Sequence, residues 1–357
     1  MRDPLVLLLM LIGIALYFLS VQSFWLTLHG LDWQSLITVL GLLLMVHALQ
    51  QTGLAQAVAS YGVQKVRDER SWILLICLFT CVLAALLTND VALLIVLPML
   101  AQVRLGPASD RKMWIGVACA ANIGSMITPF GNPQNVILWQ TSHWTVSHFV
   151  EAMAPLTLTL LVVLLVWLWH RVGKDAVALH LHAEHVRVHT QARELVLMLI
   201  LFIVLADHQF WRCELGILLL VLVRHARWLK YWKPELAYIF FLMFLDIALL
   251  QNIPDIQYWL DHVVWTKQTG LMAGIILSQI ISNVPATLML VHTHIPVPVL
   301  MYAVNTGGFG IATGSLANII MLRWPGRPHG ILWRFHMYSF AFLWVSWMVS
   351  AIVLARP

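Results

Sequence analysis

The sequence predicts an all-α polytopic membrane protein with two inverted-topology repeats, each holding a re-entrant helical hairpin and a discontinuous helix. Three observations predict this fold class: the composition, the positions of the basic residues and an internal repeat. The 357 residues are 61% hydrophobic and 10% charged, whereas soluble domains average about 25% charged residues. A membrane-spanning helix takes about 20 apolar residues, so the chain can hold about ten helical crossings and no large soluble domain. This composition excludes a soluble enzyme and a disordered protein.

Apolar runs separated by polar segments mark the expected helices. The first run continues past Ser20 without a clear small-residue cleavage site, so an uncleaved helix is expected and not a signal peptide. Two later runs contain polar breaks, one at residues 88–90 and one at residues 282–285. The expected organisation is N-terminal scaffold helices in 1–71, a first repeat in 72–170 (hairpin 72–103, broken helix 113–142), a cytoplasmic linker in 171–193, scaffold helices in 194–267, and a second repeat in 268–357 (hairpin 268–295, broken helix 298–323, last helix 331–355).

The basic residues give the orientation. Suppose that the N-terminus is cytoplasmic and that each broken run returns to the side from which it enters. All but three of the 21 Lys and Arg residues then face the cytoplasm, the exceptions being Arg212, Lys267 and Arg356. The net charge of +5 is therefore assigned to cytoplasmic loops and not to nucleic-acid binding. The expected location is a bacterial-type inner membrane, with the C-terminus outside; charge does not distinguish a re-entrant hairpin from two full spans.

The polar linker between the two halves contains four histidines, His180, His182, His185 and His189. His185 and His189 are one helical turn apart, which leaves a metal site as an alternative. No HExxH pattern accompanies them, and a solvated amphipathic linker is the favoured interpretation.

An internal repeat carries the expected site. Residues 122–135 align without gaps on residues 305–318. The matched pairs include Asn122 with Asn305, Gly124 with Gly307, Gly131 with Gly314, and Asn135 with Asn318. Upstream, Thr88-Asn89-Asp90 matches Ser282-Asn283-Val284. The first hairpin would enter from the cytoplasm and the second from outside, an inverted arrangement that is typical of secondary transporters.

Each break offers residues that start helices. The expected capping residues are Asn89 or Asp90, Asn132 (followed by Pro133), Ser282 or Asn283, and Ser315. Four helix N-termini that converge in the membrane favour an anion, and glycines let the backbone approach it. The expected substrate-binding residues are Thr88, Asn89, Asn122, Gly124, Gly131, Asn132, Asn135, Ser282, Asn283, Asn305, Gly307, Gly308, Gly314 and Asn318.

Asp90 is the asymmetric element of the repeat, because its counterpart Val284 is apolar. A carboxylate at membrane depth is a functional candidate, so Asp90 is expected to bind the coupling ion, H⁺ or Na⁺, with Asn89 and Asn122; a purely structural capping role is the alternative. No cofactor or metal beyond this possible Na⁺ is expected. Asp246 is the other acid within an apolar run, where a helix-packing hydrogen bond is favoured over a coupling role.

With these motifs the sequence resembles the ion transporter superfamily, which includes arsenite permeases, sodium/proton antiporters and divalent-anion or citrate symporters. It looks closest to the arsenite-permease-like anion permeases. The resemblance covers most of the chain from Trp72 onward. It implies a scaffold domain and a transport domain, substrate between the hairpin tips, elevator-like alternating access and often a homodimer. Both tips read Ser-Asn-Thr in the dicarboxylate symporters, and the different tips here put a dicarboxylate substrate in doubt.

The expected function is secondary transport of a small anion or oxyanion, coupled to H⁺ or Na⁺. A sodium/proton antiporter without an anion substrate and a sodium-coupled carboxylate symporter are the alternatives. A channel is also compatible with two opposed hairpins. An intramembrane hydrolase that uses Ser125 or Ser315 with His47 or His292 is disfavoured, because no nucleophile-elbow pattern is present.

Overall fold

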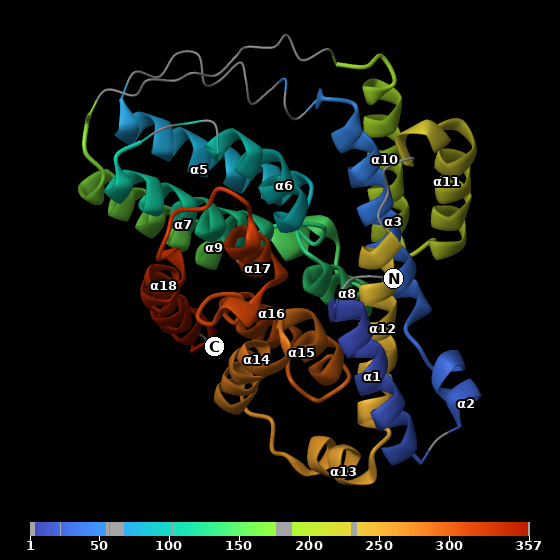
Figure 1. Ribbon diagram of the computed structural model, residues 1–357. Helices are drawn as coiled ribbons and strands as arrows, with labels where there is room; N and C mark the ends of the chain where they lie inside the picture. The colour runs from blue at the N-terminus through green and yellow to red at the C-terminus, as the bar shows by residue number, and fades with distance from the viewer. Residues whose placement is uncertain are drawn as a thin grey trace.

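The computed structural model describes residues 4–21, 23–54, 57, 68–101, 103, 105–175, 188–229 and 234–355, and its elements are helices (Figure 1). The helices of the N-terminal half are α1 (Pro4–Leu19), α2 (Phe24–His29), α3 (Trp33–Gln51), α5 (Glu69–Leu86), α6 (Asn89–Leu100), α7 (Pro107–Ser125), α8 (Pro133–Ser142) and α9 (Val146–Arg171). Those that follow are α10 (Ala192–Asp207), α11 (Trp211–Arg224), η1 (Ala226–Leu229), α12 (Pro234–Gln251), α13 (Pro254–His262), α14 (Lys267–Ile281), α15 (Asn283–Leu290), α16 (Val297–Thr306), η2 (Ala312–Gly314), α17 (Leu316–Arg323) and α18 (Ile331–Leu354).

Five of the described helices are long and apolar enough to cross a membrane, namely α3, α5, α9, α12 and α18. This length and composition confirm the prediction of a multi-pass, all-helical membrane protein. The first apolar run differs from the expectation of one helix. It forms α1 and α2, because Ser23 starts a new helix by accepting a hydrogen bond from the amide of Leu26 (3.3 Å).

The helices gather in two groups (Figure 1). In one group α3 packs against α10, α11 and α12, and α1 packs against α12. The other group contains α5 to α9 and α14 to α18, in which α5 packs on α7, α14 packs on α16, and α9 packs on α18. The two groups meet where α3 contacts α8 and where α12 contacts α15.

The helices α5 and α6 pack side by side and run in opposite directions, so that the chain returns to the edge of the molecule where α5 begins and where α7 also begins. The backbone amide of Gly106, just before α7, donates to Oε1 of Glu69 at the start of α5 (2.9 Å). At the same edge Nε of Arg70 donates to the carbonyl of Val172 after α9 (2.9 Å). Asp68 caps α5, and the hydrogen bond from the amide of Ser71 (2.9 Å) lowers the pKa of the Asp68 carboxyl. This edge is the one that the basic residues assign to the cytoplasm.

The second pair, α14 and α15, is broken at Ser282, and its first helix begins at a different edge of the molecule. Nζ of Lys267, at the start of α14, donates to the carbonyl of Leu354 at the end of α18 (2.9 Å). Part of the predicted charge distribution lies outside the described residues, namely Arg2, Lys65, Arg67, Arg104, Arg187, Lys230, Lys233 and Arg356.

Candidate functional site

Four helices begin at the breaks in the group that contains α5 to α9 and α14 to α18, namely α6, α8, α15 and α17. Their capping residues differ in part from the predicted ones. Thr88 caps α6 by accepting from the amide of Val91 (3.3 Å), so the prediction of Asn89 or Asp90 as the cap is wrong. Asn132 caps α8 as predicted, by accepting from the amide of Asn135 (3.0 Å). Ser282 and Ser315 occupy the cap positions of α15 and α17, but neither side chain makes a capping hydrogen bond.

Asparagines of the two halves are hydrogen-bonded across the site. Nδ2 of Asn122 donates to Oδ1 of Asn318 (2.8 Å), and Nδ2 of Asn305 donates to Oδ1 of Asn135 (2.7 Å). Since Asn122 matches Asn305 and Asn135 matches Asn318 in the repeat, each bond is the repeat equivalent of the other. All four side chains are 5% exposed or less.

A second pair of bonds follows the same equivalence. Nδ2 of Asn132 donates to Oδ1 of Asn305 (3.3 Å), and Oγ of Ser315, the residue aligned with Asn132, donates to Oδ1 of Asn122 (3.1 Å). The resulting cluster is fully buried and polar. Such clusters are costly unless their groups are satisfied, so these bonds specify how the halves fit together.

A third pair connects each half to itself. Nδ2 of Asn135 donates to the carbonyl of Ser125 (3.1 Å), and Nδ2 of Asn318 donates to the carbonyl of Gly308 (2.9 Å). Ser125 and Gly308 are aligned in the repeat. Each asparagine therefore satisfies a buried carbonyl that the end of α7 or α16 leaves free.

The tip of the first hairpin joins this cluster. The backbone amide of Asn89 donates to the carbonyl of Gly131 (3.0 Å), and its Nδ2 lies 3.5 Å from Oδ1 of Asn122. At the second tip, Oγ of Ser282 lies 3.5 Å from Oδ1 of Asn283. Asn283 is 3% exposed and reaches toward Gly308, with its Nδ2 3.6 Å from where a Cβ of Gly308 would lie. Asn89 and Asn283 are thus brought to the cluster, whereas no hydrogen bond among the described residues joins the side chain of Thr88 or Ser282 to its four asparagines.

Asp90 is buried in the first turn of α6. Its side chain is 5% exposed, and its Oδ1 has no hydrogen-bond partner among the described residues. The Oδ1 atom of Asn89 accepts from the backbone amide of Asp90 (2.9 Å) and so fixes the turn. An unpartnered buried carboxyl oxygen is a favourable place for a proton or a small cation.

The matched glycines allow parts of the chain to pack closely, while their approach to a ligand stays a prediction. A Cβ on Gly131 would lie 2.3 Å from the carbonyl oxygen of Ser125, and one on Gly314 would lie 2.5 Å from that of Gly307. On Gly307 it would lie 2.4 Å from the Cβ of Ser278. Gly308, a predicted site residue that is aligned with Ser125, is more open, since the nearest atom to its Cβ position is 3.2 Å away.

Sequence reasoning missed Gln279, which organises the break in the second half. Its Nε2 donates to the carbonyls of Gly307 (2.7 Å) and Phe309 (2.9 Å), and its Oε1 accepts from the amide of Ile311 (2.8 Å). The signal was available, because a glutamine within an apolar run near a break needs polar partners. In the first half Thr128 likewise bonds to the backbone near a break, since its Oγ1 donates to the carbonyl of Ala85 (2.7 Å).

The serines that could have suggested a hydrolase are engaged with the asparagine cluster. Oγ of Ser125 donates to the carbonyl of Asn122 (2.9 Å), and Asn132 donates to this hydroxyl (3.1 Å). Oγ of Ser315 donates to the side chain of Asn122. Both hydroxyls therefore serve the packing of the breaks.

Ser282 holds a backbone conformation that favours glycine, with φ 75° and ψ 157°. For a non-glycine residue this conformation costs about 1–3 kcal/mol. We expect Ser282→Gly to raise the stability of the folded protein by about 1 kcal/mol, after the greater chain entropy of glycine is subtracted. The measurement is the midpoint of thermal unfolding in detergent. Ser282→Ala keeps the unfavourable φ and serves as the control; an equal rise in that variant would contradict the prediction.

Asp246 lies between α12 and α1, and the expected helix-packing hydrogen bond is absent among the described residues. Both carboxyl oxygens are buried without a partner, and Oδ1 lies 2.5 Å from where a Cβ of Gly13 would be. A cavity of about 490 Å³, lined largely by apolar side chains, adjoins Asp246.

Removing the unpaired carboxyl of Asp246 should help folding. We expect Asp246→Leu to raise stability by roughly 1 kcal/mol or more, because an unsatisfied buried polar group is replaced by an apolar one that the adjoining cavity accommodates. Thermal unfolding in detergent measures this change. A fall in stability together with loss of solute uptake would instead give Asp246 a role in coupling.

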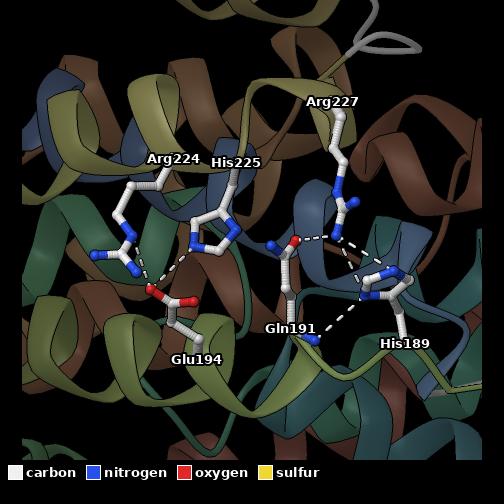
Figure 2. A network of polar contacts seen from close by, with 6 residues as sticks. All are labelled: His189, Gln191, Glu194, Arg224, His225 and Arg227. Carbon is white, nitrogen blue, oxygen red and sulfur yellow. Dashed lines mark hydrogen bonds and ion pairs between the residues drawn. The ribbon is translucent and has the colours of Figure 1, made fainter.

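A separate polar network joins the start of α10 to the end of α11 (Figure 2). Glu194 forms an ion pair with Arg224 (3.1 Å) and lies 3.6 Å from Nε2 of His225. On the other side of the network Arg227 lies 3.2 Å from Nε2 of His189. These contacts fix the two helix ends at the edge that the sequence assigns to the cytoplasm.

The possible metal site in the linker is described only in part. His180, His182 and His185 lie outside the described residues, so His189 is the one expected histidine that is placed. In the part of the chain that the structure describes, no group of three or more His, Cys, Asp or Glu side chains is arranged to hold a metal ion.

Comparisons with known proteins agree with the resemblance to ion transporters. A family model described as "Citrate transporter" matches residues 2–296. The "Inner membrane protein YbiR" of Escherichia coli K12 is 34% identical over 355 residues, which cover 97% of this chain and 94% of that protein. The "Uncharacterized transporter MJ0456" of Methanocaldococcus jannaschii is 28% identical over 87% of this chain and 86% of its own length. The "Putative transporter arsB" of Dictyostelium discoideum is 22% identical over 30% of this chain and 19% of its own.

Proposed function

The chain belongs to the citrate transporter family, and from that premise we propose that this membrane transporter is a secondary active carrier of a small anion or oxyanion, coupled to H⁺ or Na⁺. The expected setting is a bacterial-type inner membrane with a cytoplasmic N-terminus. Proteins of this kind bind solute where two inverted repeats meet near the middle of the bilayer.

The crossed asparagine bonds carry this proposal. If each residue is replaced by its counterpart in the other repeat, the bond from Asn122 to Asn318 becomes the bond from Asn305 to Asn135. This equivalence is what a pseudo-two-fold axis through the site would produce. It supports two inverted halves, with α5–α6 and α14–α15 as hairpins that enter the membrane and return.

The two groups of helices suggest how access alternates. The group with α3, α10, α11 and α12 would be the scaffold, and the group with both hairpins would be the transport domain. The asparagines are bonded to one another and almost fully buried. Solute would therefore replace these bonds, and the transport domain would carry it past the scaffold in an elevator-like movement.

The charge at the breaks supports coupling to a cation. Among the predicted site residues Asp90 has the only formal charge, and the others are Asn, Ser, Thr and Gly. The four helix N-termini supply partial positive charge, which favours an anion. A bound anion close to Asp90 would still be repelled, so H⁺ or Na⁺ at Asp90 with Asn89 and Asn122 would be needed for the anion to bind well.

Uptake in proteoliposomes tests the role of Asp90. With imposed H⁺ or Na⁺ gradients, the wild type should accumulate labelled citrate, arsenite, phosphate or sulfate, whereas Asp90→Asn should lose gradient-driven accumulation. The reason is that an amide neither carries a proton nor binds Na⁺ as a carboxylate does. Asp255→Asn, the same change at an exposed acid in the first turn of α13, is the matched control and should retain uptake. Full ion-coupled uptake by Asp90→Asn would exclude Asp90 as the coupling residue.

A sodium/proton antiporter without an anion substrate is the second candidate. The absence of basic side chains among the predicted site residues favours it, since a single buried acid can exchange H⁺ for Na⁺. Vesicles loaded with a pH-sensitive dye would decide: a pH change on adding Na⁺ without any of the test anions supports antiport, and no change supports anion transport.

A further inference from the structure

A second buried acid, Glu214, lies outside the asparagine cluster. It occupies the first turn of α11, and its side chain is fully buried. Oε2 lies 2.8 Å from Oγ1 of Thr38 on α3, and Oε1 has no hydrogen-bond partner among the described residues. No described cation is paired with this carboxyl group.

The hydrogens around Thr38 show which form of Glu214 fits. Oγ1 of Thr38 lies 2.8 Å from Glu214 and 3.0 Å from the carbonyl oxygen of Gln34. A hydroxyl has one hydrogen, so it cannot donate to both a carboxylate and a carbonyl. If Glu214 is protonated, its O–H donates to Thr38, and Thr38 donates to Gln34. Both contacts are then satisfied, whereas an ionised Glu214 leaves one of them without a hydrogen.

Several of the charged groups on the elements around Glu214 have partners of their own. Elements packed against α11 are α3, α10 and η1. With α11 itself, their titratable side chains and caps are Asp32, His47, Arg193, Glu194, Asp207, His208, Arg212, Cys213, Arg224, His225 and Arg227. Asp32 accepts from the amide of Ser35, and Asp207 accepts from the amide of Val146. Glu194 pairs with Arg224 (Figure 2). Arg224 is ten residues, and therefore about 15 Å, along α11 from Glu214.

Gln34 also forms a hydrogen bond between α3 and α8. Its Nε2 donates to Oε1 of Gln140 on α8 (2.9 Å). Gln140 is held further by α10 and the turn after it, since its Nε2 donates to the carbonyl of Ala206 (3.1 Å) and its own carbonyl accepts from Nε2 of Gln209 (2.9 Å). The helix α8 begins at Asn132 and bears Asn135. Gln34 is thus common to both contacts: its backbone carbonyl lies beside Thr38, and its side chain bonds to the helix that supports the asparagine cluster.

We propose that Glu214 is a proton-binding site distinct from Asp90. Its proton determines whether Thr38 donates to the carbonyl of Gln34, the residue of α3 whose side chain bonds to α8. When Glu214 loses its proton, Thr38 turns from the carbonyl of Gln34 to the carboxylate, and the α3–α8 contact loosens. The protonation of Glu214 is inferred from its contact with Thr38, whereas the link between this proton and transport rests on the proposed function.

Infrared difference spectroscopy of the purified full-length protein tests the proton directly. At neutral pH the carboxylic acid C=O band of the wild type should lose one component in Glu214→Gln. Thr38→Val should shift that component, because the acid loses its hydrogen-bond partner, and this second variant decides if Glu214→Gln does not fold. Loss of an ionised carboxylate band in Glu214→Gln, or no shift in Thr38→Val, would overturn the proposal.

Hydrogen exchange tests the link to α8 in the full-length protein, with Gln34 and Gln140 left in place. The exchange rates of the backbone amides of α8 are compared with and without Glu214→Gln at each pH, so that the pH dependence of the exchange chemistry cancels. We expect the ratio of the two rates to change several-fold as the pH rises, and a constant ratio would overturn the link. If no test solute is transported, the proposed function fails, while the infrared result still decides the proton at Glu214.

Discussion

Replacing Gly124 by alanine is expected to prevent α7 from packing on α5. The new Cβ would lie 2.0 Å from the carbonyl oxygen and 2.7 Å from the Cα of Cys81, and these are backbone atoms that no side-chain rotation can move away. The two helices would have to separate along the closest contact in the first half. We expect a cost of roughly 3 kcal/mol or more, measured as a fall of about 5 °C or more in the midpoint of thermal unfolding in detergent.

Gly216 provides the matched control for Gly124. It also lies within a helix, α11, but a Cβ there would meet nothing within 4 Å. Since alanine favours a helix over glycine by about 1 kcal/mol, Gly216→Ala should leave the midpoint unchanged or raise it. Equal midpoints for the two variants would show that α5 and α7 do not approach this closely.

Replacing Asn318 by alanine is expected to damage both folding and transport. Its amide donates to the carbonyl of Gly308, and its Oδ1 accepts from Asn122. Both partners are buried, so two polar groups would lose a hydrogen bond, each at about 1–3 kcal/mol. We expect a loss of roughly 3 kcal/mol and uptake at the level of protein-free vesicles. The midpoint of thermal unfolding and solute uptake measure the two effects.

A double-mutant cycle separates the Asn122–Asn318 bond from general damage to the site. Because the two residues share a hydrogen bond, Asn122→Ala with Asn318→Ala should cost about 1–2 kcal/mol less than the sum of the single variants. Asn252→Ala combined with Asn318→Ala is the control, since the side chain of Asn252 bonds to Thr27 (3.4 Å) and, among the described residues, to no member of the asparagine cluster. Strict additivity for the pair would contradict a direct bond between the halves.

The positions of the breaks could be predicted from the sequence because their chemistry is local. Asn132 followed by Pro133 is a helix start wherever it occurs, and the structure places α8 there. At the first tip three polar residues in a row could each cap α6. The sequence could not choose among them, and Thr88 does so because its side chain reaches the amide of Val91.

The partners of the asparagines could not be predicted in the same way. The alignment of Asn122 with Asn305 shows that the two positions are equivalent, but it does not show that Asn122 bonds to Asn318. That bond depends on how two distant segments pack. The glycines illustrate the same limit, since the sequence marks Gly131 as a place of close approach without showing that the approaching group is the backbone of Ser125.

Counterflow tests alternating access at the asparagine cluster most directly. Proteoliposomes are preloaded with unlabelled citrate, arsenite, phosphate or sulfate, and the labelled form of the same solute is added outside. A carrier that exposes one site to each side in turn should accumulate the label transiently above its external concentration for at least one of these solutes. Asn318→Ala should abolish that accumulation. Flux without transient accumulation would indicate a channel, and no counterflow with any of the four solutes would contradict transport of a small anion or oxyanion.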